Sequence, residues 1–286
     1  MPYATAADGI RLHYQVTGRR GQPPILFIQG LGADKHGWDM QRLGMAWSHC
    51  AIALDNRGAG RSDKPIGAYS LEQMAADAIA VLDDAGIETA HVVGASMGGA
   101  IAQMLTIGYS ERVRSLTLAC TSCRNHAWRR ELLASWGASA RRYGMGAMTR
   151  EAARWVIGPR SFRRLMPAFG WLGPLAFGRP RHAFANQVDA ILAADDGDSE
   201  DLRSIRVPTL VVVGNQDILT PRGDSEELAE LIPTAELVVI SGAAHGLMVE
   251  HASTFNRILG DFLRRSEKAY QASLTPATGA TAAAAG

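Results

Sequence analysis

The 286-residue sequence has few cysteines, no excess of charge of one sign and no long hydrophobic run. Its three cysteines, Cys50, Cys120 and Cys123, are too few and odd in number for a disulfide framework, so we expect a cytoplasmic location. Cys120 and Cys123 form one C-x-x-C after an apolar run. Without a second such pair we interpret them as residues at a strand end, not as a metal or redox site.

The formal charge of +1 gives no basic footprint of the kind that nucleic acid requires, so we expect no nucleic-acid partner. The N-terminus lacks a basic segment followed by an apolar one, and no stretch of about 18 apolar residues occurs, so neither export nor a membrane span is expected. With 47% hydrophobic residues, the chain can form a large core.

Short apolar runs alternate with longer helical stretches. The runs cover 24–28, 51–54, 91–94, 115–118, 209–214 and 237–240. Such alternation is typical of an α/β fold with a mostly parallel central sheet flanked by helices. One of the helices is expected to begin at Ser70, which has capping-box spacing to Gln73, and to end near Gly86.

The segment 124–203 lacks a strand run and carries four of the six tryptophans. We predict a helical lid here, inserted between two core parts at 1–123 and 204–265, followed by a disordered tail at 266–286. Arginines outnumber acidic residues over 124–188. We interpret them as solvated helix faces, with steering of an anionic substrate as the alternative.

The sequence Gly-Ala-Ser-Met-Gly-Gly at 94–99 follows an apolar run and precedes a helical stretch. A serine in such a turn is typical of a nucleophile elbow, where a strained backbone lifts the hydroxyl above the sheet edge. Gly94 and Gly98 must be small because the strand and helix backbones come close there. We predict Ser96 as the nucleophile, with the Met97 N–H aimed at a developing oxyanion.

A serine hydroxyl needs a base to take its proton and an acid to orient that base. Asp217 directly follows the 209–214 run, and His245 lies in a loop of small residues after the 237–240 run. The chain order serine, aspartate, histidine is the one expected with a nucleophile elbow. We therefore predict that Asp217 and His245 serve Ser96 as acid and base.

These motifs resemble those of the α/β-hydrolase superfamily over roughly 8–123 and 203–264. The resemblance rests on the 94–99 elbow, the loop Gln29-Gly30-Leu31-Gly32, the block at 54–63 and the loops around Asp217 and His245. It implies that the Leu31 N–H is the second oxyanion donor. Members of the family often have histidine at the position of Gln29, so this residue could change how the loop is braced.

The resemblance implies a serine hydrolase that cleaves a carboxylic ester or lactone of a small molecule through an acyl-enzyme on Ser96. Three alternatives stay open: a carbon–carbon bond hydrolase, an acyltransferase or perhydrolase, and a ligand-binding protein on a hydrolase scaffold. Serine at the elbow disfavours epoxide opening and dehalogenation, for which the family uses aspartate. We expect no metal and no organic cofactor, because no Walker A, G-x-G-x-x-G or H-E-x-x-H motif is placed to bind one.

The tryptophan, methionine and phenylalanine content of the lid indicates a fairly apolar pocket. For any single aromatic residue, packing of the lid against the core is the alternative. The residues expected to line the pocket are Gln29, Gly30, Trp128, Trp155 and Leu219.

Overall fold

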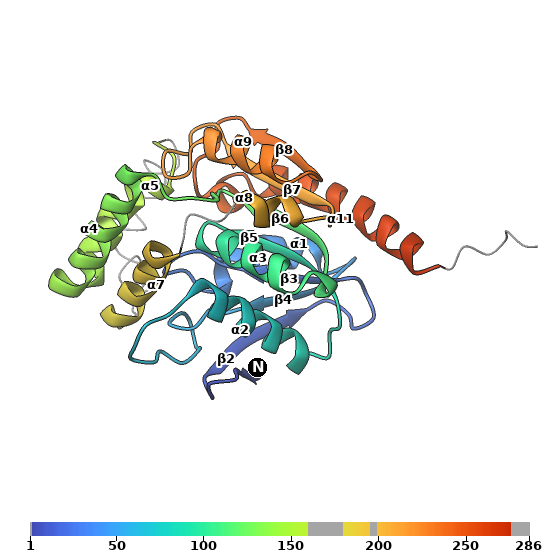
Figure 1. Cartoon of the computed structure of the whole chain (residues 1–286), viewed down its shortest axis with the longest axis horizontal. Coiled ribbons are helices and arrows are strands. Elements are labelled where there is room, and N and C mark those ends of the chain that lie inside the picture. Colours follow the sequence, from blue (N-terminus) through green and yellow to red (C-terminus); the bar gives the residue numbers. More distant parts are fainter. Residues whose placement is uncertain (1, 160–179, 195–198, 276–286) are drawn as a thin grey trace, which may run out of the picture.

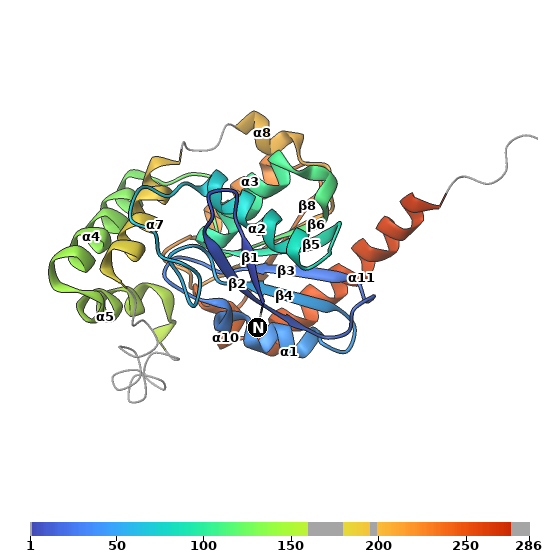
Figure 2. The same cartoon turned by 90° about the horizontal axis from the view of Figure 1, so that it is seen from below.

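A computed structural model describes residues 2–159, 180–194 and 199–275. Figures 1 and 2 show a central sheet with helices on both faces and further helices beyond one end of the strands. The strands are β1 (Tyr3–Thr5), β2 (Arg11–Thr17), β3 (Pro24–Ile28), β4 (Cys50–Leu54), β5 (Ala90–Ala95), β6 (Val113–Ala119), β7 (Thr209–Gly214) and β8 (Ala235–Ile240). The α-helices are α1 (Asp39–Met45), α2 (Leu71–Asp84), α3 (Met97–Gly108), α4 (Ala127–Tyr143), α5 (Met145–Val156), α7 (Arg181–Ala193), α8 (Ser199–Ser204), α9 (Arg222–Leu231), α10 (Leu247–Glu250) and α11 (Ala252–Leu274).

The sheet has the order β1-β2-β4-β3-β5-β6-β7-β8. β2 pairs antiparallel with both of its neighbours, and the pairs from β4 through β8 are parallel. The predicted fold class is confirmed, and all six predicted runs are strands. β1 and β2 were not predicted because they are short or rich in polar residues, so they lack the apolar run that identifies a buried strand.

Both faces of the central strands are buried, which explains their continuous apolar runs. On β3, Leu26 and Ile28 belong to the core layer that includes residues of α2 and α3. Ile25 and Phe27 point to the opposite layer, which includes Phe255 of α11. The sheet is thus held between two apolar layers, and its loops at the carboxyl ends of the strands are left to carry function.

Helix α2 begins as the capping pattern predicts. The Ser70 side chain accepts a hydrogen bond from the Gln73 N–H at 3.1 Å. The helix ends at Asp84, and Gly86 takes a left-handed backbone with φ 69°. Both predicted ends are confirmed within two residues.

The segment between β6 and β7 is helical in its described residues. Helix α4 packs against α5 and α7 to the side of the sheet, and these three are called the cap helices below (Figure 1). Helix α8 lies beside the core helices α3 and α9 instead. Trp171, one of the tryptophans of this segment, lies outside the described residues.

Helix α11 continues to Leu274, so the prediction of a disordered tail from 266 is wrong for 266–274. Polar contacts hold the end of α11 against the core. Glu267 forms an ion pair with Arg114 at 3.1 Å, and the Arg114 guanidinium lies over the Tyr270 ring. The Tyr270 hydroxyl also forms a hydrogen bond with the Thr89 hydroxyl. The tail was predicted from its lack of large apolar residues, and this criterion does not detect polar contacts. Residues 276–286 of the predicted tail lie outside the described part of the chain.

Among the described residues, no helix is long and apolar enough to cross a membrane.

Candidate active site

Ser96 lies on the sharp turn that joins β5 to α3. Its backbone has φ 54° and ψ −123°, a conformation that costs free energy in any residue with a side chain. The two flanking glycines permit the turn, because a Cβ on Gly94 would lie 2.2 Å from the Gly98 oxygen, and one on Gly98 would lie 2.2 Å from the Ile28 oxygen. Thr121 Oγ1 donates to the Ser96 carbonyl at 2.8 Å and braces the turn. The geometry expected of an elbow is present.

Asp217 and His245 form a buried pair at the ends of neighbouring strands. Asp217 Oδ2 lies 2.8 Å from His245 Nδ1, and both side chains are withdrawn from solvent. Asp217 Oδ1 accepts the N–H groups of Leu219 and Thr220, each at 2.9 Å. The Thr220 hydroxyl, which the sequence motifs did not single out, donates to Asp217 Oδ2 at 2.9 Å. These bonds fix the carboxylate against the imidazole.

The pKa of Asp217 lies below its ordinary value. Burial acts to raise this pKa, but the charge of His245 and the hydrogen bonds from His245 and Thr220 outweigh burial. Asp217 is therefore ionised at neutral pH and can only accept hydrogen bonds. In the neutral imidazole, His245 Nδ1 therefore carries the proton of the shared bond, and Nε2 is the acceptor.

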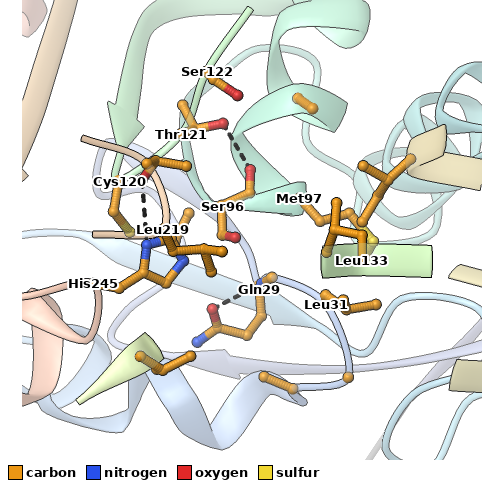
Figure 3. Close-up of a pocket in the computed structure, with 18 of the residues that line it drawn as sticks. Gln29, Leu31, Ser96, Met97, Cys120, Thr121, Ser122, Leu133, Leu219 and His245 are labelled. Atoms are coloured by element: carbon orange, nitrogen blue, oxygen red, sulfur yellow. Dashed lines mark hydrogen bonds between the residues drawn. The ribbon is translucent and has the colours of Figure 1, made fainter. Parts of the chain in front are cut away.

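Ser96 and His245 both line one cavity of about 840 Å³, whose wall also includes residues of all three cap helices (Figure 3). Within the described residues, the Ser96 hydroxyl makes no hydrogen bond with His245 or any other protein group. Bonds between a nucleophile and its base are often long until substrate binds. The arrangement thus places an uncommitted hydroxyl and a basic imidazole nitrogen on one cavity wall.

Leu31 and Met97 also line this cavity. Met97 is the first residue of α3, where a backbone N–H has no acceptor within the helix. Leu31 follows Gly30, which approaches the nucleophile so closely that an added Cβ would lie 3.0 Å from Ser96 Cβ. Neither the Leu31 nor the Met97 N–H has a hydrogen-bond acceptor among the described residues. Two backbone donors thus remain available beside Ser96.

Gln29 braces the loop that carries Gly30 and Leu31. Its Oε1 accepts the Gly30 N–H at 2.8 Å, and its backbone oxygen accepts from Asn56 Nδ2 at 2.8 Å. The side chain is packed so tightly that a Cβ on Gly37 would lie 1.9 Å from its Nε2. Gln29 therefore braces this loop, and it lines the cavity together with Gly30 and Leu219, as expected.

Trp128 and Trp155 do not line the cavity, so their assignment to the pocket was wrong. They stack on one another with ring centroids 6.1 Å apart, and Trp128 is 40% exposed. On α4, the cavity is lined by residues 129, 133 and 136, which follow helical spacing, and Trp128 lies outside this series. The apolar residues of the cap helices that do line the cavity include Leu133, Trp136, Met148, Val156, Phe184 and Ile191.

This assignment predicts a change in substrate range. Leu133→Ala is expected to move the optimum toward longer acyl chains, because Leu133 projects into the cavity (Figure 3). The ratio of kcat/KM for a longer ester to kcat/KM for a shorter one should rise about tenfold over the wild-type ratio. This is the order of magnitude expected for added methylene groups in an apolar pocket. Trp128→Ala is the control and should leave the preference unchanged. Relative kcat/KM over a series of p-nitrophenyl esters tests both variants, and equal profiles would contradict the assignment.

The two arginines at the α4 end of the cavity are paired with acidic residues of α9. Arg129 is buried and contacts Asp224 at 2.6 Å and the Leu219 oxygen at 3.1 Å. Arg124 pairs with Glu227. The interpretation of the arginines as solvated is thus wrong for Arg129. Its charge is neutralised by Asp224, so this residue gives no support to the alternative of anionic-substrate steering.

Cys120 and Cys123 are free thiols just beyond β6, where they were expected. Burial raises the pKa of both thiols, so neither is an activated thiolate. The described residues contain no group of three or more His, Cys, Asp or Glu side chains arranged to hold a metal ion.

Comparisons with known proteins agree with this architecture. A family model described as the alpha/beta hydrolase fold matches residues 23–145. A putative carbamate hydrolase RutD of Azorhizobium caulinodans is 32% identical over 92% of this chain and 98% of its own length. The chain belongs to the α/β-hydrolase family. A 2-hydroxymuconate semialdehyde hydrolase of a Pseudomonas species is also similar, being 32% identical over 92% of this chain and 94% of its own length.

Among solved structures, the enol-lactonase of Burkholderia xenovorans LB400 superposes on this α/β hydrolase with a TM-score of 0.86. It is 28% identical and covers 92% of this chain and 100% of its own. The names of these relatives support a hydrolase, and they cover more than one kind of scissile bond.

Proposed function

We propose that this α/β hydrolase is a serine hydrolase that cleaves a carboxylic ester or lactone of a fairly apolar small molecule. The observation that carries the proposal is the buried His245–Asp217 pair, whose 2.8 Å bond leaves His245 Nε2 as a base in the cavity that holds Ser96. A serine on a strained elbow beside such a base is suited to nucleophilic catalysis.

In this mechanism Ser96 Oγ attacks the acyl carbonyl while His245 Nε2 takes the hydroxyl proton. Asp217 stabilises the resulting imidazolium, and the N–H groups of Leu31 and Met97 donate to the oxyanion. His245 then protonates the leaving oxygen. Water, activated by the same imidazole, attacks the acyl-enzyme and releases the acid, which restores Ser96.

The cavity wall supports the proposed substrate class. Side chains such as Leu133, Met148 and Phe184 give the space near Ser96 an apolar lining. An apolar acyl group or ring would be desolvated there at little cost. The named enol-lactonase favours a lactone as one candidate. The named semialdehyde hydrolase keeps carbon–carbon bond cleavage as the second candidate function.

Turnover of p-nitrophenyl butyrate and of unsubstituted lactones, followed by acid quenching and intact-mass analysis, tests the proposal. We expect saturable turnover and a transient mass increase of one acyl group, located on the peptide that contains Ser96. Cleavage of dienoate carbon–carbon bonds without ester or lactone turnover would favour the second candidate. Products made only when an alcohol or peroxide is added would favour acyl transfer, and ligand binding without any turnover would favour a binding protein.

A further inference from the structure

Helix α7 is joined to the Gly30–Leu31 loop through one buried amide side chain. Gln187 is 1% exposed, and its Oε1 accepts the Gly32 N–H at 3.0 Å. Its Nε2 donates to the Arg57 oxygen at 2.8 Å. Phe184, one turn earlier on α7, packs on the same loop, since a Cβ on Gly32 would lie 2.9 Å from its ring. A cap helix therefore holds two core loops, one after β3 and one after β4.

The loop that Gln187 contacts is a tight turn. The Ala33 N–H donates to the Gly30 oxygen at 3.2 Å, and Gly32 has φ 65°. A positive φ at the third of four residues is typical of a type II turn, whereas in a type I turn the central peptide is flipped. The N–H of that central peptide belongs to Gly32, so its bond to Gln187 opposes the flip. The Leu31 N–H belongs to the preceding peptide of the same four-residue turn, so anchoring Gly32 restrains Leu31 by limiting movement of the turn as a whole.

We propose that Gln187 is a positioning residue for the oxyanion hole, through which α7 fixes the turn that presents the Leu31 N–H. The inference rests on the proposed function, because it assumes that Leu31 donates to an oxyanion. The cap then has two tasks: it walls the cavity, and it sets the geometry of one of the two oxyanion donors. Closure or loosening of α7 would thereby change the rate of the chemical step as well as access to the site.

The amide of Gln187 suits this task because it offers an acceptor to Gly32 and a donor to Arg57 at once. Methionine has nearly the same length but satisfies neither group, so Gln187→Met should release the turn. Asparagine keeps the amide but is one methylene shorter, so Gln187→Asn should lose the bond with less change in polarity. Val188→Ala is the matched control, since Val188 is equally buried on α7 and packs on Gly137 of α4.

The experiment measures kcat and KM for p-nitrophenyl butyrate and the inhibition constant of an aliphatic trifluoromethyl ketone, whose serine adduct places an oxyanion in the hole. For Gln187→Met and Gln187→Asn we expect kcat to fall by about tenfold or more, as small misplacements of catalytic groups do, with KM changed by less than about threefold. The inhibition constant should rise by a similar factor, because the ketone adduct resembles the transition state. Val188→Ala should lower the Tm while leaving kcat and the inhibition constant near those of the wild type.

Equal kcat and ketone affinity in wild type and in a folded Gln187 variant would overturn the inference, as would a Val188→Ala variant with the same losses. If Gln187→Met does not fold, Gln187→Asn carries the test. A wild-type protein that neither hydrolyses the ester nor binds the ketone would contradict the proposed function itself. This outcome differs from an active wild type whose Gln187 variants are equally active, which would contradict only the inference about Gln187.

Discussion

Ser96→Ala is expected to lower kcat for p-nitrophenyl butyrate by about 10⁴- to 10⁶-fold, because removal of a serine nucleophile leaves only binding and oxyanion stabilisation. Alanine keeps the Cβ and takes the same strained backbone, with φ 54°, so the fold should be retained. The loss should appear in kcat, since Ser96 contributes little to holding the ground-state substrate.

Purified wild-type and Ser96→Ala proteins would be compared by steady-state kinetics, with circular dichroism melting as the check on folding. Ser135→Ala is the matched control, because Ser135 is exposed on α4 and bonds only its own helix. Residual activity of Ser96→Ala within tenfold of the wild type would mean that another group attacks the substrate.

Asp217→Asn is expected to lower kcat by about 10⁴-fold, the effect commonly found when the acid of such a triad becomes an amide. The amide can still accept from the N–H groups of Leu219 and Thr220, so the loop should keep its shape. An amide nitrogen facing His245 Nδ1 would donate to it, which favours the wrong tautomer and moves the proton to Nε2. The imidazole then cannot accept the Ser96 proton.

The same substitution has a pH signature. Because the pKa of Asp217 is lowered on folding, its ionised form stabilises the protein at every pH above its ordinary value of 3.8, and this contribution is lost as pH falls through the lower folded value. The difference in Tm between wild type and Asp217→Asn should therefore shrink as pH falls below 3.8. Asp261→Asn, at an exposed surface position, is the control. A difference in Tm that stays unchanged when the pH is taken below that value would mean that the fold does not stabilise the ionised form of Asp217.

Most of the sheet and the three central side chains could be predicted from the sequence, because the signals are local. Apolar runs mark buried parallel strands, and the residues just after them, such as Asp217, meet at one edge of the sheet. The contribution of Thr220 was missed because a threonine in a loop has no distinctive pattern. The bond between Gln187 and Gly32 joins residues that are far apart in the chain, so only the folded structure reveals it.

The cap was harder to predict for a related reason. Aromatic content suggested Trp128 and Trp155 for the pocket, but orientation on a helix decides which side chains reach a cavity. The face of α4 defined by Leu133 and Trp136 can be recognised only when the packing partner of that helix is known. The same limit applies to Arg129, whose burial depends on Asp224 in a distant helix.

Intact-mass analysis after exposure to a fluorophosphonate tests the central claim most directly, because it detects an activated serine without knowledge of the substrate. The account predicts one phosphonyl group on the wild type, on the peptide that contains Ser96, and none on Ser96→Ala or Asp217→Asn over the same time. A folded wild type that remains unlabelled, or labelling that persists in Ser96→Ala, would contradict the assignment of Ser96 as the nucleophile.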